Sequence, residues 1–245
     1  MTLSRKHTKK SEKDRIRWRG QEVSRIEAFS DAVFAFAVTL MVVSLEVPKN
    51  YEELKHLMKG FLPFAICFAI FFQVWTTQNK FFRRYGLHDR MTLTLNAVLL
   101  FLMLFFAYPL KFMWSTIFRF EAAFQTPEQA SELFCIYGLG FAAIYLLFAI
   151  MYRHAYNLRE HLHLTESEVF ETRTHIYINT GMACVGLFSA TLAALGPNYV
   201  SYAGMSYMLI GLVVTLTYTR RGKLHRKKFE MEPTSVKIDE PAIAE

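Results

Sequence analysis

Residues 25–48 read RIEAFSDAVFAFAVTLMVVSLEVP, a run that begins with charges and then continues as apolar residues until Pro48. In a helix, the charged residues Arg25, Glu27 and Asp31 would all lie within the first two turns. The apolar part approaches the length of about 20 residues that crosses roughly 30 Å of hydrocarbon. The stretch therefore predicts a membrane helix whose charged beginning is either an ordinary helix end or a functional part.

Similar apolar runs recur along the whole chain. Its 245 residues are 53% hydrophobic and include 23 phenylalanines, and the mean hydropathy is +0.18. We expect an all-α integral membrane protein with six transmembrane helices, with a tight turn at Gly196-Pro197-Asn198 between the last two. The expected spans are residues 27–47, 58–80, 91–114, 132–152, 174–195 and 199–219.

Lysines and arginines are distributed unevenly between the connections. The two terminal tails and the second and fourth connections carry 23 of them, and the three other connections carry five. Cytoplasmic loops are enriched in Lys and Arg, so this pattern predicts that both termini are cytoplasmic. The net charge of +7 then belongs to segments that lie against anionic lipid headgroups, and it gives no reason to expect nucleic acid as a partner.

The same reasoning divides the chain into three parts. Residues 1–24 form a basic cytoplasmic tail, residues 25–220 form one transmembrane domain, and residues 221–245 form a second tail that is basic and then disordered. No motif of a metalloprotease, a serine hydrolase or a phosphate-binding loop occurs. The span centres also lack ionisable residues, which argues weakly against a proton relay. We therefore expect neither an enzyme nor a cofactor or metal site.

The spacing within residues 25–48 gives the first helix two faces. At about 100° per residue, Ala32, Phe36, Thr39 and Val43 fall on one stripe with Leu40 at its edge. From periodicity alone, this stripe favours ordinary packing against lipid or protein over a special role. Asp31 points roughly 120° away from it, and an unpaired carboxylate at this depth is costly. The partners we expect for Asp31 are Arg25, Asn79, Arg83, Arg84, His88 and Arg90.

The motif Arg25-x-x-x-Phe29-Ser30-Asp31 at the start of an apolar first helix resembles the signature of the transmembrane protein 175 family. These are potassium channels of endosomes and lysosomes, with single-repeat, six-helix relatives in bacteria and archaea. The similarity continues through VWTTQNKFFRR at residues 74–84, LTLNAVLL at 93–100 and AYPL at 107–110.

The resemblance implies a homotetramer in which helix 1 of each subunit lines a central pore for potassium and other monovalent cations. Large apolar side chains at Phe36, Leu40 and Val43 would constrict the pore, and Thr39 would supply a hydroxyl layer linked to a modest selectivity. A structural network behind the pore would include Arg25, Phe29, Ser30, Asp31 and Asn79.

The chain departs from the family pattern at two of these positions. Phe36 replaces a branched aliphatic residue, and Asn79 stands where many relatives have His. The implied location is the inner (plasma) membrane of a prokaryote, with the lipid bilayer as surroundings. Two alternatives to a channel remain at this point: a secondary transporter, and a membrane interaction protein that conducts nothing.

Overall fold

The computed structural model describes residues 18–20, 24–43, 48–59, 61–119, 124 and 126–229. Within these ranges, the side chains at 42–43, 56, 59, 119, 223 and 225–229 are not part of the description. The predicted disorder of the C-terminal tail concerns residues 230–245, which lie outside the described residues.

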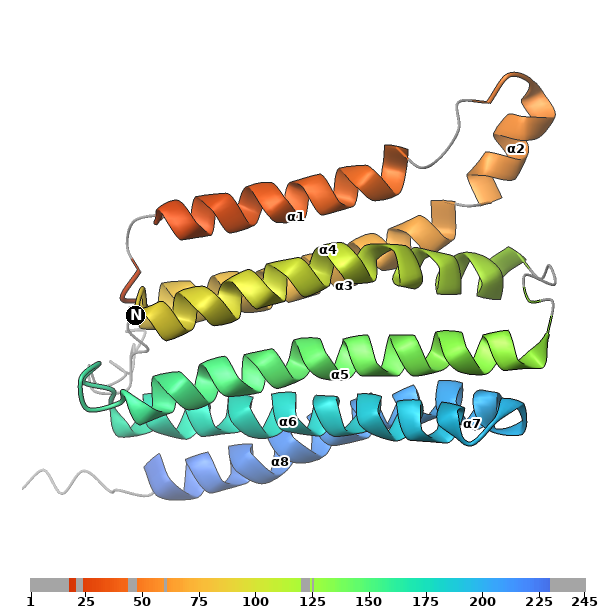
Figure 1. The fold of residues 1–245 in the computed structure, drawn as a ribbon. Coiled ribbons are helices and arrows are strands. Elements are labelled where there is room, and N and C mark those ends of the chain that lie inside the picture. The colour runs from red at the N-terminus through yellow and green to blue at the C-terminus, as the bar shows by residue number, and fades with distance from the viewer. Residues whose placement is uncertain are drawn as a thin grey trace, which may run out of the picture.

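The described chain consists of helices joined by short connections. In order they are α1 (Arg25–Val43), α2 (Tyr51–Lys59), α3 (Phe61–Tyr85), α4 (Arg90–Arg119), α5 (Pro127–Asn157), α6 (Glu166–Ala194), η2 (Pro197–Tyr199), α7 (Val200–Met205), η3 (Ser206–Met208) and α8 (Leu209–Phe229). The long helices run side by side, with α1 against α3 and α4 and with α5, α6 and α8 on the other side (Figure 1). The expected all-α architecture is confirmed.

Five of the described segments are long and apolar enough to span a membrane: residues 61–85, 90–118, 127–157, 166–194 and 197–222. They correspond to the last five predicted spans. The remaining predicted span, the first along the chain, corresponds to α1. This helix has 19 residues and is not among the candidates, and residues 44–47 of its predicted range lie outside the described residues.

The last span differs from the continuous helix predicted for residues 199–219. It begins with η2 after Gly196, whose φ of 125° suits a residue without a Cβ. It then continues as α7, the 3₁₀ turn η3 and α8. Because α8 extends to Phe229, the predicted domain boundary at residue 220 falls inside a helix.

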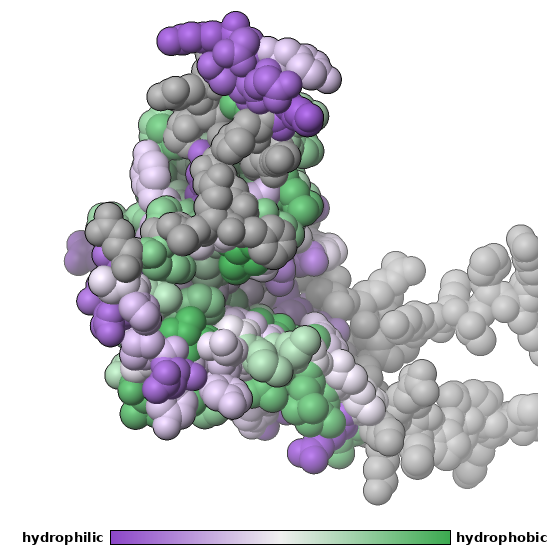
Figure 2. Space-filling view, turned by 90° about the vertical axis from the view of Figure 1, so that its right-hand side faces the viewer, coloured by the Kyte–Doolittle hydropathy of each residue, from purple (hydrophilic) through white to green (hydrophobic). Residues whose placement is uncertain are grey.

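Helix α2 was not predicted. Asn50 accepts a hydrogen bond from the backbone N–H of Glu53 (2.9 Å) and donates one to the Glu53 carboxylate (2.8 Å), so the two residues close the first turn reciprocally. The side chains of Glu52, Glu53 and Lys55 are exposed, and the top of Figure 2, where this helix lies, is hydrophilic. A short amphipathic helix thus follows α1 at the end of the molecule that is turned to the viewer in that figure.

The connections gather at two ends. The beginning of α1, the α3–α4 and α5–α6 connections and the end of α8 lie at one end, and α2 and the α4–α5 connection lie at the other (Figure 1). The described segments richest in Lys and Arg therefore share an end. The positive-inside pattern read from the sequence corresponds to a real separation of charge along the helix axes.

Close helix packing rests on small residues. A Cβ on Gly138 of α5 would lie 2.8 Å from the carbonyl oxygen of Gly186 on α6, and a Cβ on Gly186 would lie 2.8 Å from that of Gly138. Only glycine permits this backbone approach. Small residues at such crossings are the usual means of tight helix association in a membrane, where apolar side chains gain little by leaving lipid.

Candidate functional site

Helix α1 has two faces of opposite character. One face packs on α3 and α4 and buries Glu27, Ser30, Phe34, Ala37 and Met41. The other face is exposed along the length of the helix and carries Arg25, Ala28, Phe29, Ala32, Ala35, Phe36 and Thr39. Phe29 and Phe36 are 62% and 57% exposed, so the single subunit leaves a large apolar stripe uncovered.

The residues expected to form a constriction lie on or beside this exposed stripe. Phe36 is fully on it, and Leu40 lies at its half-buried edge. The side chain of Val43 lies outside the described residues. The Thr39 hydroxyl donates its hydrogen to the carbonyl oxygen of Phe36 (2.7 Å), so its lone pairs remain available as acceptors on the exposed face.

Asp31 has a different partner from those expected. The indole N–H of Trp75 on α3 donates to Asp31 Oδ1 at 2.6 Å, and neither an ion pair nor a hydrogen bond joins Asp31 to Arg25, Asn79, Arg83, Arg84, His88 or Arg90. The Trp75 ring also packs against Phe72, with centroids 5.4 Å apart. The expected partners, which were cationic or hydrogen-bonding side chains, were wrong because the indole of Trp75, four residues before Asn79, occupies the position beside the carboxylate.

Next to this pair, three buried polar side chains connect α1, α3 and α4. Gln78 donates to Asn96 Oδ1 (2.9 Å), Asn96 donates to Ser30 Oγ (3.0 Å), and Ser30 donates to the carbonyl oxygen of Ile26 (2.7 Å). Each of the three side chains is at most 1% exposed. Buried polar groups joined in this way fix one arrangement of the helices, because any other leaves an unpaired group.

Asn79, the amide expected in this network, forms none of these bonds; its neighbour Gln78 does. Gln78 and Asn96 lie within the stretches that carry the family resemblance, but the predicted structural network did not include them. Phe29, which was also expected in the network, lies on the exposed face.

The charged beginning of α1 is a capped helix start. Ser24 and Glu27 bond reciprocally: the Ser24 hydroxyl donates to Glu27 Oε1 (2.8 Å), and the Glu27 backbone N–H donates to Ser24 Oγ (3.3 Å). This is a capping box, and its carboxylate lies at the positive end of the helix dipole. Arg25 is exposed, and its guanidinium makes no ion pair or hydrogen bond with the described residues.

The comparisons with known proteins agree on one family. Residues 25–109 match the family model described as "Endosomal/lysosomal potassium channel TMEM175". A potassium channel of Marivirga tractuosa is 38% identical over 195 residues, which cover 74% of this chain and 78% of the relative. The chain belongs to the TMEM175 family.

Two further TMEM175 relatives extend the comparison. A potassium channel of Chamaesiphon minutus is 30% identical over 142 residues, covering 55% of this chain and 66% of that protein. The crystal structure of a variant of the potassium channel MtTMEM175, in complex with a nanobody–MBP fusion, superposes with a TM-score of 0.77 at 32% identity. That superposition covers 85% of this chain and 97% of the other. The chain therefore has the same fold as this potassium channel.

Residues before the TMEM175 match are also held in place. The two terminal guanidinium nitrogens of Arg19 donate to the Glu168 carboxylate (3.1 and 2.9 Å), and the Gly20 backbone N–H donates to the carbonyl oxygen of Arg83 (3.0 Å). Glu168 is only 1% exposed and also closes the capping box of α6 with Thr165. The chain is thus fixed to α3 and α6 immediately before α1, and residues 18–20 pack against these helices.

Proposed function

We propose that this chain is the subunit of a homotetrameric, potassium-preferring channel in which α1 lines a central pore. The observation that carries the proposal is the uncovered stripe of α1, which runs the length of the helix opposite a buried, hydrogen-bonded face. In a tetramer, four such stripes around an axis would cover one another. The names of the relatives, which are potassium channels, support potassium as the permeant ion.

In this arrangement Phe36, Leu40 and Val43 form successive apolar rings. Narrow apolar rings exclude water and so act as a gate, and widening or rotating them restores a water path. Thr39 lies between the first two rings and presents an oxygen whose own hydrogen is already bonded to the backbone. Such oxygens can replace part of the hydration shell of a cation but repel an anion, which favours cation conduction.

The contacts behind α1 hold the rings at one depth and rotation. Asp31 is bonded to Trp75, and Ser30 is bonded through Asn96 to Gln78. We assign the structural role of the motif to these two contacts, with Phe29 and Arg25 available to a neighbouring subunit. Asn79 has a lesser part in this proposal than the sequence suggested.

We further propose that α1 also spans the membrane, which brings the number of transmembrane helices to six. Both chain termini then lie in the cytoplasm of a prokaryotic cell, on the side of the Lys- and Arg-rich end. The positive-inside rule supports this orientation. The helical stretch that includes Arg220 and Arg221 would then lie against the headgroups of the inner membrane, where basic residues are favoured.

The test is potassium flux in liposomes with the purified protein, together with its oligomeric mass in detergent. A tetramer that collapses a potassium gradient without a second substrate is the expected result. Phe36→Ala should increase the flux and lower the preference for potassium over sodium. Phe188→Ala is the matched control, because Phe188 is 49% exposed on α6, away from α1.

Four outcomes would contradict the proposal. A monomer or dimer would remove the axial pore, and a flux unchanged by Phe36→Ala would remove Phe36 from the conduction path. Exchange that requires a second ion would identify the secondary transporter, and a protein that moves no ion in the liposome assay would fit the non-conducting alternative.

A further inference from the structure

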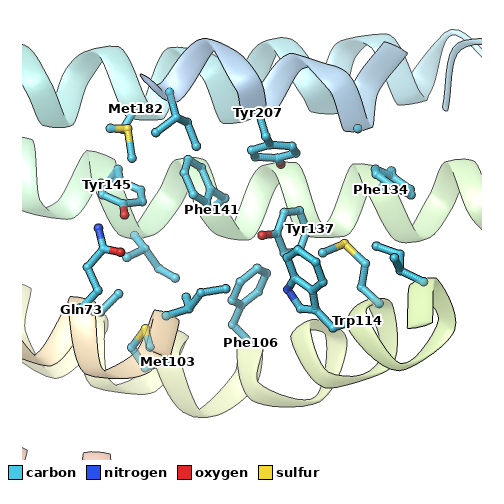
Figure 3. Close-up of a pocket in the computed structure, with 17 residues that line it drawn as sticks. Gln73, Met103, Phe106, Trp114, Phe134, Tyr137, Phe141, Tyr145, Met182 and Tyr207 are labelled. Carbon is cyan, nitrogen blue, oxygen red and sulfur yellow. The ribbon is translucent and has the colours of Figure 1, made fainter. Parts of the chain in front are cut away.

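A partly open cavity of about 490 Å³ lies between the helices of the subunit, on the side of α3 and α4 that faces away from α1. Gln73, Met103, Phe106 and Trp114 line it from α3 and α4, and side chains of α5, α6 and η3 close it from the opposite side (Figure 3). Its volume is within the range of about 300–1,000 Å³ found for small-molecule sites. It lies between the layer that carries the proposed pore helix and the layer of α5, α6 and α8.

The chemistry of the walls restricts the occupant. No Lys, Arg, Asp, Glu or His is among the described residues that line the cavity, and aromatic rings dominate it. Tyr137 stands at its centre, with its ring centroid 5.3 Å from that of Phe106 on one side and 5.3 Å from that of Tyr207 on the other. A charged ligand would find no counter-charge here, which is costly at membrane depth. The occupant is therefore neutral and offers flat or compact apolar surface to the rings.

One hydrogen-bonding atom in these walls has no protein partner within the described part of the chain. The indole nitrogen of Trp114 is buried and makes no hydrogen bond there. A buried polar group left without a partner costs about 1–3 kcal/mol. An indole N–H can only donate, so the missing partner of Trp114 is an acceptor. In Figure 3, Trp114 and Tyr207 lie on opposite sides of Tyr137.

We propose that this cavity binds a compact, neutral amphiphile whose carbonyl oxygen accepts a hydrogen bond from Trp114 Nε1 while its apolar body packs against the wall formed by Tyr137, Phe106 and Phe141. An acyl chain of a lipid would fill the apolar volume but would leave the indole unpaired. Water would pair with the indole but would gain little from the aromatic walls. The site is separate from the exposed stripe of α1 and does not depend on whether α1 conducts ions.

Benzophenone is a suitable probe because it is a neutral ketone flanked by two rings and because it is photoreactive. Near-ultraviolet light excites its carbonyl, which takes a hydrogen atom from a nearby C–H bond; the two radicals then combine into a tertiary alcohol with a new C–C bond. The purified full-length protein is irradiated with increasing benzophenone in lipid nanodiscs, and the adducts are located by peptide mapping. We expect saturable labelling on cavity residues such as Met103 and Met182.

Two competitors and two variants test the assigned hydrogen bond. Phenyl benzoate, which has an ester carbonyl, should displace benzophenone, whereas diphenylmethane, which has the rings but no oxygen, should compete about tenfold less well, the factor expected for one hydrogen bond. Trp114→Phe keeps the ring and removes the N–H, and it should raise the half-saturating concentration by a similar factor. Tyr108→Phe is the matched control, because Tyr108 is 59% exposed on the same helix and does not line the cavity.

Labelling that does not saturate and is spread over outward-facing residues would overturn the proposal, because it would reflect partitioning into lipid alone. Labelling inside the cavity that diphenylmethane displaces as well as phenyl benzoate would also overturn it, since the site would then be an apolar slot for acyl chains. If Trp114→Phe does not fold, the comparison of the two competitors on the unaltered protein still decides between these results.

Discussion

The bond between Trp75 and Asp31 allows a direct test of how α1 is held. Trp75→Phe removes the N–H that donates to Asp31 at 2.6 Å, and it keeps an aromatic ring to pack against Phe72. Hydrogen bonds to charged groups contribute about 1.5–3 kcal/mol in soluble proteins, whereas interhelical hydrogen bonds in membranes average about 0.6 and reach about 1.7 kcal/mol. Asp31 lies beside an apolar groove lined by Phe34 and Phe68, which disfavours an unpaired carboxylate. We therefore expect a coupling energy of about 1–2 kcal/mol.

A double-mutant cycle measures this coupling. Wild type, Trp75→Phe, Asp31→Ala and the double variant are unfolded by SDS titration in mixed micelles, and the four free energies of unfolding are compared. The double variant should lose about 1–2 kcal/mol less than the two single variants predict by addition. Asp31→Asn is the conservative control, because its side-chain oxygen can still accept from the indole, and it should lose less stability than Asp31→Ala.

Additive effects would refute the reasoning. If the coupling is below about 0.5 kcal/mol, the usual limit for independent sites, Trp75 holds α1 through packing alone. The same variants distinguish stability from assembly: Asp31→Ala should also reduce the tetramer fraction in detergent if this contact positions the pore helix.

Three further predictions concern other parts of the fold. Gln78→Ala should lower the free energy of unfolding by about 1–3 kcal/mol because it leaves a buried amide oxygen of α4 unpaired, whereas Asn79→Ala should change it by less than about 0.5 kcal/mol. The same SDS titration ranks the two variants, and the reverse order would restore the role expected for Asn79. Gly186→Ala should lower the free energy of unfolding by about 1–3 kcal/mol, since its Cβ would lie 2.8 Å from a carbonyl oxygen of α5. Gly211→Ala, with open space around its Cβ, should leave the melting temperature equal or higher. Burial opposes ionisation of Asp89, but hydrogen bonds from Thr92 and His154 outweigh it, and the pKa of Asp89 lies below its usual value. The contribution of Asp89 to stability is therefore present above the unfolded-state pKa of about 3.9 and is lost as the pH falls through the lower folded-state pKa. Asp89→Asn should therefore flatten the decrease in melting temperature on acidification below about pH 4.

The five candidate spans were predictable because long apolar runs have few alternatives to a membrane helix. Their ends were less predictable, because hydropathy reports the part of a helix in hydrocarbon, whereas the helix itself continues until its backbone is capped. Helix α6 was expected from residue 174 and begins at Glu166, where Thr165 and Glu168 form a capping box. The sequence signal for that start, Thr-x-x-Glu, was present, as was the Asn-x-x-Glu signal that begins α2.

The shared face of residues 32, 36 and 39 follows from spacing alone, whereas its exposure is seen only in the structure. The partner contacts of α1 do not follow from spacing, because they depend on how neighbouring helices are rotated. The expected partners of Asp31 were cationic or hydrogen-bonding side chains at the cytoplasmic helix ends. The indole N–H of Trp75 was not among them, although an indole within a span can also stabilise a carboxylate and brings less desolvation cost than a guanidinium.

The choice between Gln78 and Asn79 could nevertheless have been made from the sequence. On α3, Gln78 falls on the helical stripe that also carries the buried residues Cys67, Phe71, Val74 and Tyr85. Asn79 is turned by about 100° from that stripe. The same holds for Asn96 among the buried residues Thr92, Leu99, Met103, Phe106 and Leu110 of α4, and for Ser30 among Glu27, Phe34, Ala37 and Met41 of α1.

A polar residue on such a stripe must find a partner across a helix interface, because neither lipid nor water is available to it. Three helices that each carry one such residue at similar depth can satisfy all three by meeting, and Gln78, Asn96 and Ser30 do meet. Depth and stripe together therefore identify the polar contacts of a membrane helix bundle better than the chemical type of the side chain does.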